Sequence, residues 1–120
     1  INDPVVSNRN PLVTTGAFTV TTLTLTNANW LQISGGVTVT ITNAFTWNNS
    51  ATIQGLLQSQ SVNSPVTLSV GGTVTMTWVG IQSVTKAGAG SITATNSFNL
   101  GGNTGVSITG PSGGARFIGG

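Results

Sequence analysis

Few side chains in this 120-residue sequence could carry out acid–base, nucleophilic or metal chemistry. The charged residues are Asp3, Arg9, Lys86 and Arg116, and neither His nor Cys occurs. A single carboxylate cannot form the pair that glycoside hydrolysis requires, and the ligand sets that zinc and calcium prefer are missing. Lys86 is the one candidate nucleophile or base, and we expect it on a solvated turn. The sequence therefore predicts a protein that is not an enzyme and that holds no metal or cofactor.

The three tryptophans are the other candidates for function. Trp47 falls in register with apolar positions of the repeats described below, so we expect it in the core. Exposed tryptophans are typical of surfaces that bind sugars or protein partners, and Trp30 and Trp78 are therefore a candidate binding surface with carbohydrate as one ligand. Asn48 begins an N-glycosylation sequon, which chance explains equally well in a chain so rich in Asn.

The composition also restricts the partners and the location of the protein. The net charge of +2 rests on four residues, so no cluster of Lys and Arg is available to bind nucleic acid. No apolar run approaches the roughly 18 residues of a transmembrane helix, and we expect no membrane insertion. Uncharged chains rich in Thr, Asn, Ser and Gly are typical of extracellular fibres, adhesins and virion surfaces. We therefore expect an extracellular, cell-surface or virion-surface location.

Apolar residues alternate with Thr or Ser along most of the chain, and no segment has helical periodicity. Such alternation directs one set of side chains inward and the other outward along a β-strand. The stretches with this pattern are FTVTTLTLT (18–26), VTVTIT (37–42), VTLSV (66–70), TVTMTWV (73–79), SITAT (91–95) and VSIT (106–109). Pairs of Gly or Asn punctuate the chain between several of them. The sequence therefore predicts an all-β protein.

Similar phrases recur at a nearly constant spacing. TGAFTV, TNAFTW, SVGGTV and TNSFNL begin at residues 15, 42, 69 and 95, and a looser series, LQIS, LQS and IQS, begins at residues 31, 57 and 81. A period of 26–27 residues suits one turn of a parallel β-solenoid (β-helix). We predict one solenoid domain of about four to five coils over residues 12–120, preceded by an extended arm or part-coil at 1–11. The alternative is an antiparallel β-sandwich or jelly roll.

Stacked coils would place equivalent side chains in ladders through the core. The 26–27-residue period predicts three such ladders. The first contains Leu12, Val39, Val66, Ile92 and Ile118; the second contains Phe18, Phe45 and Phe98; the third contains Val20, Trp47, Val74 and Leu100.

The Thr-x-Thr runs at 22–26, 38–40 and 73–77 resemble the ice-binding faces of some β-solenoid antifreeze proteins. Aligned on the 26–27-residue period, however, the Thr pairs do not recur at one position in every coil. We therefore expect them to be ordinary outward-facing strand residues.

Two longer stretches, GGVTVTITNAFTWNNSATIQG (35–55) and GAGSITATNSFNLGGNTGVSITG (88–110), carry a family resemblance. They resemble the β-helical repeat regions of bacterial surface and secreted proteins, including filamentous haemagglutinin-like adhesins and Thr/Gly/Asn-rich proteins of Bacteroidota. The phrase LGGNTG is also similar to segments of phage structural proteins. The resemblance covers residues 12–110 and implies a structural role outside the cell or on a virion.

Two functions follow as hypotheses. The first is a structural subunit of a filament, fibre or virion. Neither end of the sequence shows a capping helix, so coils would pair with a longer repeat chain or with further copies of the chain itself. The second is a carbohydrate-binding adhesin module or, as a weaker alternative, an ice-binding solenoid.

Overall fold

The chain forms an all-β parallel solenoid of about four turns. The computed structural model describes residues 5–6, 11–14, 16–26, 30–61 and 63–111. Its strands are β1 (Val5–Val6), β2 (Pro11–Thr14), β3 (Phe18–Thr26), β4 (Trp30–Ile33), β5 (Thr38–Asn48), β6 (Gly55–Ser59), β7 (Val66–Val70), β8 (Thr73–Thr77), β9 (Val79–Gln82), β10 (Val84–Ala87), β11 (Ser91–Thr95), β12 (Phe98–Asn99) and β13 (Ser107–Ile108). Residues 5–6 lie within the segment expected as an arm or part-coil, and they add β1 to the edge of β3.

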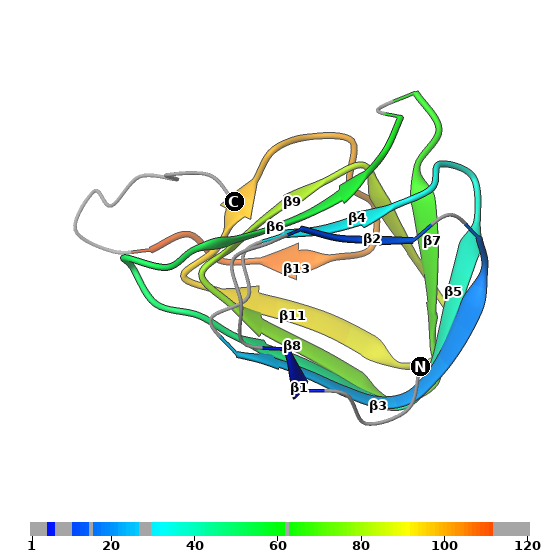
Figure 1. Cartoon of the computed structure of the whole chain (residues 1–120), viewed down its shortest axis with the longest axis horizontal. Helices are drawn as coiled ribbons and strands as arrows, with labels where there is room; N and C mark the ends of the chain where they lie inside the picture. Colours follow the sequence, from blue (N-terminus) through cyan, green and yellow to red (C-terminus); the bar gives the residue numbers. More distant parts are fainter. Residues whose placement is uncertain (1–4, 7–10, 15, 27–29, 62, 112–120) are drawn as a thin grey trace.

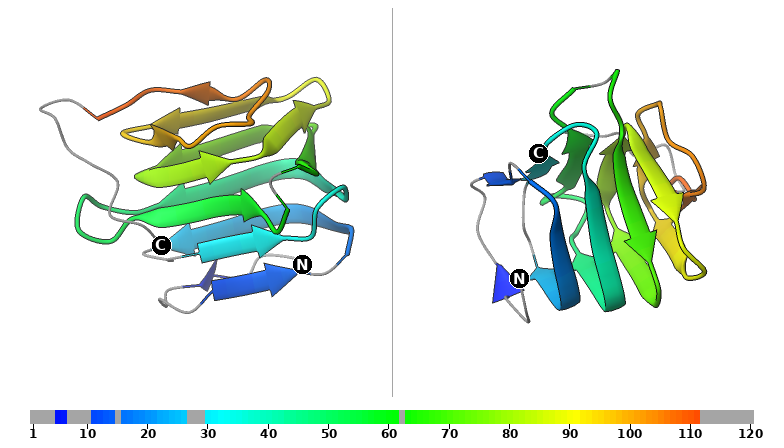
Figure 2. Two further views of the ribbon diagram at one scale, coloured as in Figure 1. Left: turned by 90° about the horizontal axis from the view of Figure 1, so that it is seen from above. Right: turned by 90° about the vertical axis from the view of Figure 1, so that its right-hand side faces the viewer.

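Three sides enclose the core and give the stack a triangular cross-section (Figure 1). The first side, here called the Gln face, contains β2, β4, β6, β9 and β12. The second, the β7 face, contains β7, β10 and the first halves of β3 and β5. The third, the Thr face, contains 22–26 of β3, 44–48 of β5, β8, β11 and β13. Figure 2 shows the Gln face in its left view and the β7 face in its right view.

The pairing of the strands excludes the antiparallel sandwich, because every strand pair in the described residues is parallel. The coils differ in length, however. In one column of the Thr face, Trp47 follows Leu25 by 22 residues, Met76 follows Trp47 by 29, and Ala94 follows Met76 by 18. The constant period of 26–27 residues is therefore wrong, although the solenoid is right.

The first predicted ladder fails because of this variation in length. Leu12 pairs with Leu31 of β4, and not with Val39. Val39 lies between Phe18 and Leu68. Two more members take other partners, in the pairs Val66–Val84 and Ile92–Val74, and Ile118 lies outside the described residues.

The other two predicted ladders are also out of register. Phe45 lies between Leu23 and Val74, so the two predicted ladders mix. Phe98 and Leu100 are half-buried at and just after β12, on the Gln face rather than in the main core. The remaining members do lie in or against the core: Val20, Val39, Phe45, Trp47, Val66, Val74 and Ile92 are buried, and Phe18 is packed against them.

The corner between the β7 face and the Thr face fixes the true register. β5 contains one more residue than β3 at this corner, where the pairing shifts between Val20 and Thr22. In the next coil the corner is made by Gly71 and Gly72, and a Cβ at Gly72 would overlap the carbonyl oxygen of Asn43. The glycine is therefore required by the close approach of two successive coils. The stretch TNAFTW (42–47) begins at this corner and continues as strand nearly to the end of β5.

Candidate functional site

A row of glutamines runs along the Gln face. Gln32, Gln58 and Gln82 occupy the same position in three successive coils. The side chain of Gln58 donates from Nε2 to Oε1 of Gln82 at 3.3 Å, and it accepts a hydrogen bond at 2.9 Å from Nε1 of Trp30. The looser sequence series that begins at residues 31, 57 and 81 therefore predicted the register correctly. Amide side chains stacked one coil apart hydrogen-bond to each other, and this favours the same residue in each coil.

Aromatic and aliphatic side chains form the neighbouring column of the same face. Trp30, Leu56, Gly80 and Phe98 are in register in successive coils. The ring of Trp78 lies with its centroid 6.3 Å from that of Phe98, tilted by 48°. We call Trp30, Leu56, Trp78 and Phe98 the aromatic patch; all four side chains are half-buried. The structure thus brings both candidate tryptophans to one face, together with Phe98, which the 26–27-residue period predicts for the core.

The backbone at Trp78 is unusual for so large a side chain. Trp78 is the single residue between β8 and β9, and its φ is 61°. The equivalent corner of the next coil begins with Asn96, whose φ is 48°. Asn tolerates this left-handed conformation, whereas for other L-residues it costs about 1–2 kcal/mol. The corner geometry therefore does not explain a tryptophan, which points to a role for its ring.

The Thr face differs from what the sequence alignment suggested. With the register of the structure, Thr and Ser recur at fixed positions in successive coils. The middle column contains Thr24, Thr46, Thr75, Thr93 and Ser107. The constant period did not predict this column. The Thr-x-Thr pair itself is still absent from one coil, because Ala44 and Asn48 flank Thr46 in β5. Asn48, the first residue of the sequon, is exposed at the edge of this face, at the end of β5.

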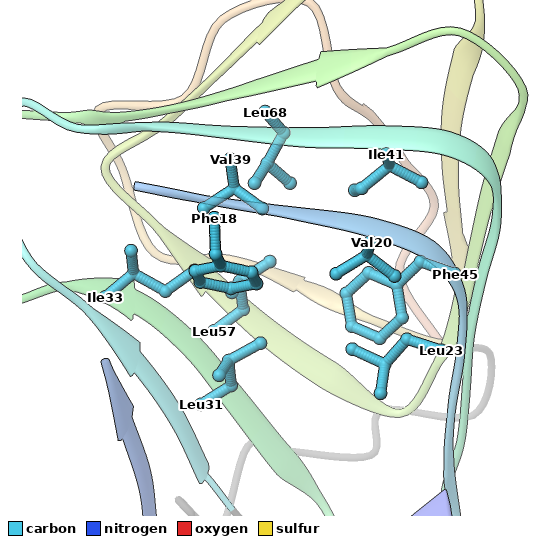
Figure 3. Close-up of a pocket in the computed structure, with 10 residues that line it drawn as sticks. All are labelled: Phe18, Val20, Leu23, Leu31, Ile33, Val39, Ile41, Phe45, Leu57 and Leu68. Carbon is cyan, nitrogen blue, oxygen red and sulfur yellow. The ribbon is translucent and has the colours of Figure 1, made fainter. Parts of the chain in front are cut away.

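An apolar cavity lies inside the first coils. Its volume is about 10 Å³, barely enough for one water molecule, and inward-facing side chains line it (Figure 3). The lining residues are Phe18, Val20, Leu23, Leu31, Ile33, Val39, Ile41, Phe45, Leu57 and Leu68. None of them offers a polar or titratable group, so the cavity is a part of the core rather than a site for polar ligands.

Groups for chemistry are as sparse in the fold as in the sequence. Within the described ranges, no three His, Cys, Asp or Glu residues lie together as metal ligands. Lys86 lies in β10, not on a turn, and its Nζ donates to the carbonyl oxygen of Gly88 at 2.7 Å. No helix among the described residues is long and apolar enough to span a membrane.

Comparison with known proteins gives no relative from which a role could be transferred. No protein-family model matches the chain, and searches of curated proteins and of solved structures also find no match. A function must therefore be inferred from the faces and edges of the solenoid itself.

Proposed function

We propose that the chain is a non-enzymatic structural module of an extracellular fibre, cell surface or virion, and that it associates through its strand edges. The supporting observation is the parallel, in-register pairing of strands along the whole stack. Among the described residues, the stack finishes in edge strands, β1 and β2 on one side and β12 and β13 on the other. Unpaired parallel edges are templates for a further coil, supplied by a longer repeat chain or by another copy.

One edge is less available than the others. Along β10, the backbone N–H of Val84 donates to Oδ1 of Asn103 at 2.9 Å, and that of Lys86 donates to the carbonyl oxygen of Thr104 at 2.8 Å. Residues 103–104 thus take the place of a strand beside β10. At this end the edges of β12 and β13 remain, and β13 is the edge that the following test addresses.

Ile108 in β13 provides the test. The N–H of Thr109 donates to the carbonyl oxygen of Ala94 in β11. Because successive N–H groups of a strand point in opposite directions, the N–H of Ile108 faces away from the stack. Ile108→Pro removes this donor, and we expect it to shorten or abolish fibres seen by electron microscopy of the concentrated protein. Ile108→Val keeps the donor and serves as the control.

Two outcomes would contradict the structural role. One is a wild-type chain that stays monodisperse at high concentration in analytical ultracentrifugation. The other is fibres that Ile108→Pro and Ile108→Val leave equally long, with both variants folded by circular dichroism.

A second function, carbohydrate binding at the aromatic patch, is favoured by Trp78. The strained backbone there keeps a ring beside Phe98, and the amides of Gln58 and Gln82 lie in the adjacent column. Aromatic faces pack against the C–H surface of a sugar, and amides donate and accept hydrogen bonds with its hydroxyls. A glycan chain lying along the stack would contact both columns.

Trp78→Asn tests this second function without altering the corner, because Asn occupies the equivalent position of the next coil. We expect wild-type protein to sediment with insoluble polysaccharides such as chitin or cellulose, and Trp78→Asn to remain in solution. Thr38→Ala, on the β7 face, should sediment like wild type. Equal sedimentation of the two variants, or none by wild type across a panel of polysaccharides, would argue against carbohydrate binding at this patch.

A further inference from the structure

Three columns of small hydroxyl side chains run along the Thr face. The middle column consists only of Thr and Ser, as given above. Each flanking column contains one residue without a hydroxyl group, Ala44 in one and Asn48 in the other. The first column consists of Thr22, Ala44, Thr73 and Ser91, and the second consists of Thr26, Asn48, Thr77 and Thr95.

The β geometry fixes the spacing of this array in two directions. Neighbouring parallel strands lie about 4.8 Å apart, and alternate residues of one strand about 6.6 Å apart. Each Thr therefore stands at a point of a nearly rectangular lattice. The β-branched side chain has few χ1 states, and the residues between the columns are anchored in the core, among them Phe45, Trp47, Val74 and Met76. The array is thus ordered before any partner arrives.

The outward groups of the array are available and uncharged. Thr73, Thr75, Ser91, Thr93 and Thr95 are exposed. Among the described residues, none hydrogen-bonds to the side-chain hydroxyls of the middle column. In the flanking columns, Oγ1 of Thr22 accepts a hydrogen bond from Nδ2 of Asn43 at 3.1 Å. The hydroxyl oxygens of Thr77 and Thr95 are hydrogen-bonded to each other at 3.5 Å.

This chemistry does not suit a protein or nucleic-acid partner. Protein interfaces depend on aromatic and Arg anchors, and nucleic acids require Lys or Arg at the phosphates; none of these residues stands in the three columns. What the array offers is a regular alternation of methyl and hydroxyl groups. The repeat between strands is close to the shorter oxygen repeat of hexagonal ice, and the repeat along the strands is about a tenth below the longer one.

We propose that the Thr face binds ice. The hydroxyls would hydrogen-bond to water molecules of the crystal plane, and the methyl groups would pack in the hollows between them. Many weak contacts at fixed spacing then add up, because no side chain has to reorganise and no charge has to be desolvated. This inference is independent of the structural role proposed above, since it concerns a face of the solenoid and not its edges.

Two variants in the middle column test the proposal, each against one matched control. Thr75→Tyr and Thr93→Tyr place a bulky, strand-compatible side chain in the array, while Thr38→Tyr places it at an exposed strand position of the β7 face. We expect wild-type protein to shape ice crystals and to depress their growth temperature below the melting point in nanolitre osmometry. Either folded array variant should lose most of this thermal hysteresis, whereas the Thr38→Tyr protein should retain it.

A second measurement does not depend on variants. Fluorescently labelled wild-type protein should be incorporated into a growing single-crystal ice hemisphere, in bands that mark the bound plane. Exclusion of the folded protein from ice would overturn the proposal, as would hysteresis that the control and the array variants lose equally.

Discussion

Gly55 in β6 lies directly against the indole ring of Trp47 in β5. A Cβ atom at Gly55 would be 2.6 Å from Cζ2 and 2.9 Å from Cε2 of that ring. Trp47 is fully buried and stacks with Phe45 at a centroid distance of 6.1 Å. The largest side chain of the core thus fits because the strand beside it has no side chain at this point.

Gly55→Ala should therefore destabilise the solenoid. Overpacking in a dense core costs about 1–3 kcal/mol, and urea denaturation followed by tryptophan fluorescence measures the loss. Gly16→Ala is the matched control, because nothing lies within 4 Å of a Cβ there. Equal stabilities of the two variants would mean that the ring of Trp47 has room to move.

Gln58→Ala should loosen the Gln face. The substitution removes the acceptor of the Trp30 indole N–H and the donor to Gln82, at a cost of about 1–2 kcal/mol. Gln60 has an exposed side chain, so Gln60→Ala should change the free energy of unfolding by less than about 0.5 kcal/mol. A red shift of tryptophan emission in the Gln58 variant alone would locate the effect at Trp30.

Asn103 joins three strands, β9, β10 and β12. Its Nδ2 donates to the carbonyl oxygen of Ile81 at 2.7 Å and to Oδ1 of Asn99 at 2.9 Å, and its Oδ1 accepts from the N–H of Val84. Asn103→Ala should cost about 1–3 kcal/mol and should speed hydrogen exchange at the N–H of Val84. Asn63→Ala, at an exposed turn, is the control. Unchanged exchange at Val84 would contradict the bridging role.

Replacing Trp78 should lower the free energy of unfolding far less than replacing Trp47. Trp78→Asn relieves a left-handed backbone strain of about 1–2 kcal/mol. It loses an aromatic contact of about 0.5–1.5 kcal/mol and the apolar burial of a half-buried ring, so the net loss of stability should be small. Trp47→Ala empties the core and should cost about 3–5 kcal/mol. Denaturant titration distinguishes the two cases. Strong destabilisation by Trp78→Asn would indicate that its ring is structural, which would weaken the case for a binding role.

Stability should hardly depend on pH near neutrality. Because His and Cys are absent from the sequence, no side chain has an ordinary pKa between about 5 and 9. Side chains that keep their ordinary pKa neither bind nor release protons in this interval, so the free energy of unfolding should be constant from about pH 5 to about pH 7. A change of more than about 1 kcal/mol over that range, measured by urea denaturation, would show that a charged group is strongly perturbed by folding.

The strands could be predicted from the sequence, but most of the register could not. The alternating stretches at 66–70 and 91–95 coincide with β7 and β11. An alternating Thr-x-Thr strand looks the same after a slip of two residues, so the pattern alone cannot choose between partners. The segments that contain Gln32, Gln58 and Gln82 could be aligned because each contains a single Gln, which marks one position of the strand.

The candidate surfaces, too, could be predicted only in part from the sequence. Trp30 and Trp78 were recognisable from residue type. Phe98, which contacts Trp78, was not, because its position depends on the length of the preceding coil. The alignment of the Thr residues into columns could not be predicted for the same reason. The lengths of the segments between strands decide which Thr residues align, and those lengths follow no sequence period.

The corner between the Thr face and the Gln face varies in length from coil to coil. It takes the six residues 49–54 between β5 and β6, but Trp78 alone between β8 and β9. The longer segment closes on itself, with backbone hydrogen bonds in both directions between Ser50 and Ile53 at 3.1 and 3.2 Å. Ala51 and Thr52 at its tip are exposed. A foreign peptide inserted between these two residues would be displayed at one corner of the triangular cross-section. The solenoid could therefore serve as a scaffold in which the coil that contains the insertion determines where the peptide lies.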